Sequence, residues 1–392
     1  MVLESSADYL LPWTVILIVL SVLYGLWSKN IRSTPRRAMV DLSKVDTSNP
    51  LVNRHVQKED IRLDSVTVSK ILIHPLKSCR GTSVPEARYT PRGLQYDREW
   101  CIIDAETHDV LTARTLASTV LVHPRLEIDP NHPYGGFMIV DVPKASGDSG
   151  YTSFSVPIKP TPDVLASWPH ITDVAMFKVD IMDGYIVQPL KPSDPNPHHI
   201  LSAYFKRDVL LMMKGPEDRY AEGTDAFPTL EAYVKYQDAY PLLIASEESL
   251  QAINDAKDRA VDADDTDPSK VSGIKKDKWN KRKIEIERFR PNIVLKGAGV
   301  PFAEDLWREI SVGNSEQSIT VVCRCARCLL PNVDTKTGER DTAVPYKVMM
   351  KFGIDRTRSN KPMFGCNGVP EGNGVIRVGD RVTVKEWIEE VA

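Results

Sequence analysis

The stretch Ile319-Thr320-Val321-Val322-Cys323-Arg324-Cys325-Ala326-Arg327-Cys328 is the part of the chain that says most about its fold. Its β-branched first half favours a strand, and the turn-rich residues 331–339 end that strand. Three cysteines at its end deliver thiols to an exposed edge. Arg324 and Arg327 favour thiolate over thiol, because a nearby positive charge stabilises the anion. The segment predicts a soft-metal ligand or a nucleophile, with core cysteines of a buried strand as the alternative.

Short β-branched segments bounded by turn residues recur on both sides of this strand, and they predict a β-rich α+β fold with two barrel-like units. The predicted strands are 66–73, 100–104, 110–113, 120–123, 136–142, 151–158, 177–187, 207–213, 241–245, 290–295 and 376–384. Ser246 followed by Glu247 and Glu248 predicts the start of a helix that continues to roughly Val261.

Length and composition set the class of protein. The 392 residues, 42% hydrophobic and 26% charged, suit two domains, or one large domain with appendages. A net charge of -3 argues against general nucleic-acid binding. The six cysteines are too few and too scattered for a disulfide scaffold, which favours a reducing compartment.

The N-terminal segment 9–27 contains no charged residue and predicts one transmembrane helix, since about 19 apolar residues approach the length needed to cross a bilayer. A cleaved signal peptide fits less well, and a buried soluble helix is the other alternative. Acidic residues precede the segment and basic ones follow it (Glu4, Asp8, Lys29, Arg32, Arg36, Arg37), so the positive-inside rule places the C-terminal bulk in the cytosol. We expect a membrane anchor at 1–29 and a linker at 30–65.

Four segments far apart in the chain place Arg, Lys, Ser or Asn at strand boundaries. They are HPLKSCRG (74–81), GLQYDREW (93–100), RFRPN (288–292) and the cysteine stretch. Arginine offers bidentate hydrogen bonds to phosphate, and lysine offers a point charge. Together they indicate an anionic ligand held near a thiolate. The basic stretch 275–283 is either a solvated face or a docking surface for an acidic partner.

These motifs resemble the MOSC superfamily and, within it, the mitochondrial amidoxime-reducing component family. The order matches: an anchor, HPLKSCRG, RFRPNIV (288–294), CARCLLPNVDTKTGE (325–339), then KPMFG (361–365) and GVIRVGD (374–380). The resemblance covers roughly 66–384 and is poor over 129–170. It implies a MOSC N-terminal β-barrel domain at 66–190 and a MOSC β-barrel domain at 191–392.

The resemblance also implies a molybdenum cofactor and the residues that hold it. Cys328 corresponds to the cysteine that binds molybdenum, and Asp238 to an acidic position beside the metal with a possible part in proton transfer. The residues that would hold the pterin and its phosphate are Lys77, Ser78, Arg98, Arg114, Arg290 and Asn292. Three departures from the family pattern stand at Glu99, at Ala239-Tyr240 and at Ala326, and the charged segment 263–283 is longer than the family predicts.

The implied function is a molybdenum-dependent oxidoreductase that reduces N-hydroxylated compounds such as amidoximes and hydroxylamines. The resemblance implies that electrons come from a b-type cytochrome and its NADH-dependent flavin reductase. It also implies location in the mitochondrial outer membrane, and the sequence is compatible with the endoplasmic reticulum as well. A non-catalytic cofactor carrier or sulfur-handling protein is the alternative function. The superfamily's cofactor sulfurases carry a pyridoxal-phosphate domain for which this chain has no room. A structural zinc or iron–sulfur site on the cysteines is the third alternative, although it would have to recruit Cys366.

Overall fold

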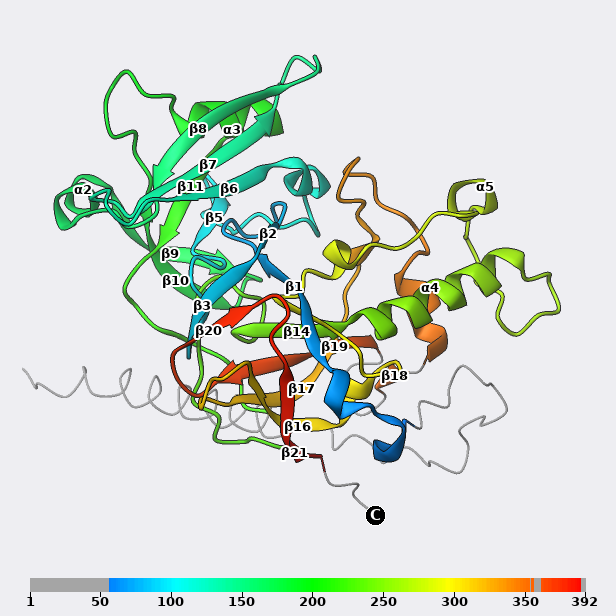
Figure 1. The fold of residues 1–392 in the computed structure, drawn as a ribbon. Coiled ribbons are helices and arrows are strands. Elements are labelled where there is room, and N and C mark those ends of the chain that lie inside the picture. Colours follow the sequence, from blue (N-terminus) through cyan, green and yellow to red (C-terminus); the bar gives the residue numbers. More distant parts are fainter. Residues whose placement is uncertain (1–55, 353, 356–360, 389–392) are drawn as a thin grey trace, which may run out of the picture. The chain divides into compact units, whose positions relative to one another are not determined.

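The computed structural model describes residues 56–352, 354–355 and 361–388 (Figure 1). The predicted membrane span at 9–27 lies outside these residues, as does most of the predicted linker. Among the helices that are described, none combines the length and the apolar character needed to cross a membrane.

A nine-stranded sheet joins the two ends of the described chain (Figure 1). Its order is β2-β1-β15-β14-β19-β17-β16-β21, and β18 pairs with β19. The strands are β1 (Thr67–Ile73), β2 (Thr82–Val84), β14 (Leu242–Ser246), β15 (Ile293–Lys296), β16 (Trp307–Val312), β17 (Ile319–Ala326), β18 (Ile354–Asp355), β19 (Lys361–Pro370) and β21 (Val382–Trp387). Because β1 is antiparallel to β15 while β14 is parallel to it, the end of β1 and the starts of β14 and β15 meet at one edge.

Four smaller sheets complete the β-structure. Their orders are β5-β11-β10-β9, β6-β7-β8, β20-β3-β4 and β12-β13. The strands are β3 (Glu86–Thr90), β4 (Gly93–Leu94), β5 (Trp100–Asp104), β6 (His123–Ile128), β7 (Gly136–Pro143), β8 (Tyr151–Pro157), β9 (His170–Met176), β10 (Asp180–Ile186), β11 (Val209–Lys214), β12 (Arg219–Tyr220), β13 (Tyr233–Val234) and β20 (Gly374–Arg377).

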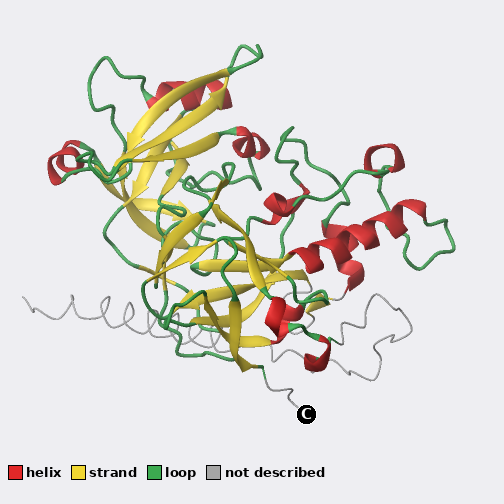
Figure 2. Cartoon of the chain, in the orientation of Figure 1, coloured by secondary structure: helices red, strands yellow, loops and turns green. Residues whose placement is uncertain are grey.

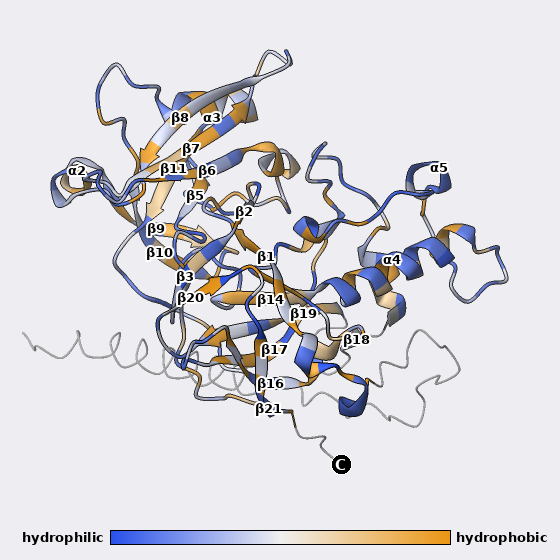
Figure 3. Cartoon of the chain, in the orientation of Figure 1, coloured by the Kyte–Doolittle hydropathy of each residue, from blue (hydrophilic) through white to orange (hydrophobic). Residues whose placement is uncertain are grey.

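Helices are few and short apart from α4 (Figure 2). They are α2 (Pro162–Ser167), α3 (Pro197–Phe205), α4 (Glu247–Asp262), α5 (Lys276–Trp279) and α6 (Tyr346–Met349), with 3-10 turns η2 (Lys58–Asp60), η3 (Leu63–Ser65), η4 (Ala117–Leu121), η5 (Ile286–Phe289), η6 (Ala303–Leu306), η7 (Leu330–Asn332) and η8 (Met350–Phe352). The hydroxyl of Ser246 accepts a hydrogen bond from Ser249 N at 3.2 Å, which caps α4 as predicted. Figure 3 shows apolar and polar positions alternating along α4, whose buried face includes Ile253, Ala256 and Ala260.

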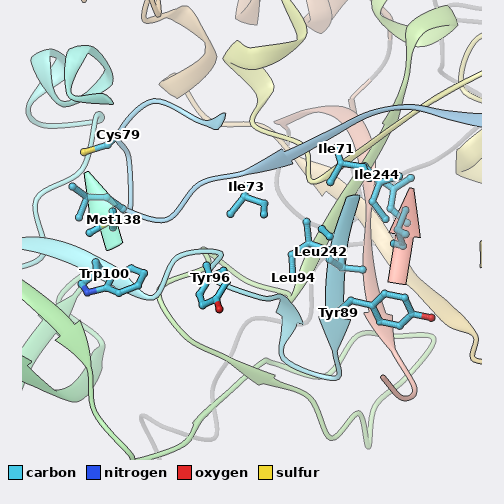
Figure 4. Packing of buried hydrophobic residues seen from close by; sticks show 14 of the residues in the cluster. Ile71, Ile73, Cys79, Tyr89, Leu94, Tyr96, Trp100, Met138, Leu242 and Ile244 are labelled. Atoms are coloured by element: carbon cyan, nitrogen blue, oxygen red, sulfur yellow. The ribbon is translucent and has the colours of Figure 1, made fainter. Parts of the chain in front are cut away.

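The largest core runs between the sheets. Figure 4 shows Ile71 and Ile73 of β1 beside Leu242 and Ile244 of β14, with Trp100 and Met138 farther along the same cluster. A second cluster lies under α4 around the buried Trp279 and Phe289. Burial of large apolar side chains next to the strand ends fixes the segments that follow those strands.

The β-rich α+β class is confirmed, whereas no sheet in the described part closes into a barrel. The predicted strands 100–104, 136–142 and 241–245 match β5, β7 and β14 within one residue. Others are wrong: most of 120–123 belongs to a 3-10 turn and its end, 110–113 forms only isolated bridges at Val110, and 376–384 is two strands separated by a turn. The segment 177–187 begins with a turn rather than a strand. The domain boundary at 190/191 stays a prediction.

Candidate functional site

All eight residues predicted for the site line one pocket of about 400 Å³. They are Lys77, Ser78, Arg98, Arg114, Asp238, Arg290, Asn292 and Cys328. The pocket is lined by six cationic side chains, the other two being Arg324 and Arg327, against two carboxylates, Glu222 and Asp238. Segments separated by more than 200 residues therefore converge on a cavity with a strong excess of positive charge.

The floor of the pocket is a row of side chains across three strands. Leu243 of β14 pairs with Asn367 of β19, and Asn367 pairs with Cys323 of β17. Directly paired residues project from the same face of a sheet, so these three side chains share one face. The amide of Asn367 donates to Cys323 Sγ at 3.4 Å.

Two cationic side chains are fixed where β1, β5 and β15 meet. Arg98 donates to Asp97 Oδ2 at 2.6 Å and to the carbonyl of Arg290 at 3.1 Å. Arg290 in turn donates to the carbonyl of Cys79 at 2.5 Å. Burial lowers the pKa of Arg290 to about 10, with Arg98 contributing in the same direction. Packing cations this closely is costly and favours a bound anion that neutralises them.

The backbone at three of these positions is strained. Ser78, Arg98 and Arg290 have φ values of 65°, 50° and 58°, in the left-handed region that disfavours side chains. Each such residue costs on the order of 1–3 kcal/mol and persists only where the surrounding structure enforces it. The family resemblance selected these three residues, and the strain is an independent sign that their placement serves a site.

Asp238 joins two of the cations. Its carboxylate accepts from Lys77 Nζ at 2.5 Å and from Arg114 at 2.7 Å. Desolvation would raise the pKa of Asp238, but Lys77 and Arg114 outweigh it and hold the pKa well below the usual range. Its side chain is still half-exposed. Asp238 is thus ionised at neutral pH and anchors the cations, while its part in proton transfer stays a prediction.

Cys328 follows the end of β17, as the sequence predicts, and its Sγ accepts a hydrogen bond from Leu330 N at 3.4 Å. The cation beside it is Arg114. Burial alone would lower the pKa of Arg114, but the neighbouring Asp238 and Cys328 outweigh burial and raise it. Arg327, predicted to act on the cysteine cluster, donates to Cys325 Sγ at 3.2 Å and to the carbonyl of Phe289. No local pattern in the sequence indicates that Arg114 lies beside the thiol.

A structural metal site on the cysteines finds no support in the described residues. There, no group of three or more His, Cys, Asp or Glu side chains is arranged to hold a metal ion. Cys366 pairs with Arg324 in the register of β17 and β19, so it projects to the face opposite Cys323 and Cys325. Cys366 is buried against the carbonyl of Glu304 at 3.3 Å, and desolvation raises its pKa.

The basic stretch 275–283 is partly used within the protein. Trp279 is fully buried and donates to Asp341 at 2.8 Å. Arg282 pairs with Asp334, which follows the cysteine strand and also binds the buried Arg288. The stretch therefore supports the loop after Cys328, and its exposed lysines remain available to solvent.

Sequence reasoning missed Phe177 and Glu222 as residues of the pocket, and it noted Tyr240 only as a departure from the family pattern. The hydroxyl of Tyr240 donates to the carbonyl of Glu222 at 3.0 Å, so these two residues form one rim. Phe177 lies at a hairpin turn on another rim. Phe177 was predicted only as the start of a strand, and Glu222 lies in a polar loop, so the local sequence around these two residues did not indicate the pocket.

Comparison with known proteins gives two family matches and several relatives. Residues 65–166 match the MOSC N-terminal beta barrel domain, and residues 231–383 match the MOSC domain. Mitochondrial amidoxime reducing component 2 of Bos taurus is 28% identical over 334 residues, which cover 82% of this chain and 84% of the bovine protein. Mitochondrial amidoxime-reducing component 1 of Mus musculus is 29% identical over 334 residues, covering 82% of this chain and 83% of the mouse protein.

Proposed function

The chain belongs to the MOSC-domain family of the amidoxime-reducing components, and from this premise we propose that it is a molybdenum-cofactor-dependent oxidoreductase that reduces amidoximes and hydroxylamines. The observation that carries the proposal is the convergence of all eight predicted residues on one cationic pocket that contains a thiol. The names of the relatives support the reaction, and the geometry supports the site.

The residues present fit such a cofactor. Its phosphate requires clustered donors, and Lys77, Arg98 and Arg290 are held together with an excess of positive charge. Its metal is soft and favours a thiolate, which Cys328 supplies beside the cation Arg114. Ser78 adds a hydroxyl to the pocket, and Asn292 lines it while its amide accepts from Leu243 N and donates to the carbonyl of Leu72.

When bound, the cofactor supplies the two-electron chemistry by which an N–OH group, two electrons and two protons become N–H and water. The chain's own residues bind and orient. Cys328 would ligate the metal, and Lys77, Ser78, Arg98, Arg290 and Asn292 would hold the pterin and its phosphate. Asp238 keeps the ammonium of Lys77 and the guanidinium of Arg114 in place through its two carboxylate oxygens.

The proposal includes an external electron source, a b-type cytochrome with its NADH-dependent flavin reductase. Lys275, Lys276, Lys281 and Lys283 are exposed and would attract an acidic cytochrome. A single-pass anchor at 9–27 would hold the catalytic part at the cytosolic face of a membrane, with the mitochondrial outer membrane as the proposed location.

The test is to measure molybdenum per chain and the conversion of benzamidoxime to benzamidine with a chemical reductant. We expect the wild type to contain molybdenum and to turn over, and Cys328→Ala to lose both while its thermal unfolding stays close to that of the wild type. Cys325→Ala is the matched comparison, because Cys325 lines the same pocket and lies three residues before Cys328 in the chain. Metal and turnover retained in Cys328→Ala would contradict the assignment of the ligand. Bound molybdenum without turnover in the wild type would favour the carrier function.

A further inference from the structure

The turn between β9 and β10 brings an aromatic ring to the pocket. Met176 and Asp180 are the last paired residues of the hairpin, and Val179 N donates to the carbonyl of Met176 at 3.2 Å. The two residues at the centre of this turn are Phe177 and Lys178. Phe177 lines the pocket and keeps 36% of its surface exposed.

The two central residues of this turn are of types that do not suit its backbone conformation. Phe177 and Lys178 have φ values of 56° and 62°, and consecutive positive φ values are the pattern of hairpin turns that favour Asn and Gly. Neither residue is of that kind. A side chain retained in a backbone that disfavours it indicates that the side chain has a use.

The ring of Phe177 packs on the two cations that hold Asp238. Arg114 Cζ lies 4.6 Å from the ring centroid and Lys77 Nζ lies 5.3 Å from it, both within the range of cation–π attraction. Arg114 also contacts Cys328. Phe177 is therefore separated from the thiol by one side chain, on the exposed side of the pocket.

Phe289 also lines the pocket, but it is fully buried and stacks on Phe364 with ring centroids 4.1 Å apart. Tyr240 lies on the other rim, where its hydroxyl is bonded to the carbonyl of Glu222. Phe177 thus offers an exposed aromatic surface to a molecule entering beside Arg114 and Cys328.

The geometry points to Phe177 as a specificity-determining residue, whose ring takes the flat, delocalised organic part of an N-hydroxylated substrate. This inference rests on the proposed function for the identity of the reacting group. Aromatic substituents gain from stacking on the ring beyond the area they bury, whereas saturated substituents of the same size do not. The preferred substrates are therefore aryl amidoximes over alkyl amidoximes.

The experiment compares benzamidoxime with cyclohexanecarboxamidoxime, which has a ring of similar size without π electrons. Binding is measured by calorimetry and turnover by kcat/KM, in the wild type and in two variants of the same turn. Phe177→Gly removes the ring and relieves the positive φ, so the turn itself is not weakened. Lys178→Gly relieves the same strain and keeps the ring, which makes it the matched control.

We expect Phe177→Gly to reduce the preference for the aryl compound by about 3- to 10-fold in both measurements, as expected for one aromatic contact. Lys178→Gly should keep the wild-type preference, and molybdenum content should be equal in all three proteins. A preference unchanged in Phe177→Gly, or lost equally in Lys178→Gly, would overturn the inference. If no amidoxime is reduced but Phe177→Gly still loses the aryl preference in binding, the proposed function fails and the role of Phe177 stands.

Discussion

Two regions of the molecule are rich in positive charge, and they differ in what surrounds that charge. In the pocket, Lys77 is buried and Arg98 and Arg290 are held by backbone carbonyls and carboxylates. In the stretch 275–283, the lysines at 275, 276, 281 and 283 are exposed. The sequence shows more consecutive positive charge in the second region than in any of the segments that form the first.

The difference shows that convergence and burial, rather than local density of charge, mark an anion site. An exposed cation is screened by solvent and ions, so its contribution to binding is small. A desolvated cation that lies next to others attracts an anion strongly, because the low local polarity that makes the cluster costly also strengthens its attraction for the ligand. The strained backbone at Ser78, Arg98 and Arg290 belongs to the first region.

The largest expected effect is on the content of cofactor. Lys77→Met removes the charge and keeps an unbranched side chain only one atom shorter, whereas Lys283→Met makes the same change in the exposed stretch. A lost charge-assisted contact of about 1.5–3 kcal/mol corresponds to a reduction in affinity of about ten- to hundredfold. We expect molybdenum per chain to fall accordingly in Lys77→Met after dialysis and to stay at the wild-type level in Lys283→Met. Equal losses in the two variants would remove the distinction between the regions.

The next effect is on stability, and it is expected where the two regions are connected. Asp334 is buried and accepts from Arg282 of the basic stretch and from the buried Arg288. Asp334→Asn leaves Arg288 without its carboxylate, and breaking such a buried pair costs about 3 kcal/mol. Urea unfolding should show this loss.

The control for Asp334 is Asp265→Asn, which removes an acid that pairs with Lys270 but is 96% exposed. Its unfolding midpoint should not change. If the two variants unfold at the same urea concentration, Asp334 does not connect the basic stretch to the loop after Cys328.

The sequence was sufficient to predict the elements whose patterns are local. Strand β17 follows from a β-branched run, strand β14 from a short apolar run, and the start of α4 from the capping residue Ser246. The family resemblance identified the eight residues of the pocket. The same residues did not reveal that Arg114 reaches Cys328, nor that Phe177 lies over Arg114 and Lys77, because these contacts depend on the relative placement of hairpins far apart in the chain.

Local sequence patterns also could not predict whether the sheet closes or how the basic stretch 275–283 is used. Barrel closure depends on which strands form the two edges, here β2 and β21, and no strand's own sequence records its position in the sheet. The buried position of Trp279 and the pairing of Arg282 require the loop after Cys328 to be in place. Long-range contacts of this kind determine what a charged residue does, although they leave no trace in its neighbours along the chain.

The smallest expected effect is on the pH dependence of stability, and it tests the crowding of cations in the pocket. His74 is buried behind the pocket, and its pKa is well below 6.5 because of burial and because of the charges of Arg290 and Arg98, which outweigh Asp97. Below pH 6.5 the unfolded chain therefore binds a proton that the folded protein does not. Stability attributable to His74 is fully present above pH 6.5 and falls as the pH is lowered through that value, by at most about 1.36 kcal/mol per pH unit for one proton.

His74→Gln removes this proton while keeping a polar side chain, so we expect the free energy of unfolding to depend less on pH between 6.5 and 5 than in the wild type. His108 is the control: it is partly exposed and contacts Asp173 at 2.9 Å, away from the pocket cations. In His108→Gln, the loss of unfolding free energy that is due to His74 should depend on pH between 6.5 and 5 as it does in the wild type. A wild-type slope that survives in His74→Gln would mean that burial and the neighbouring cations together do not hold His74 neutral in the folded protein, and the electrostatic distinction between the two basic regions would then rest on Lys77 alone.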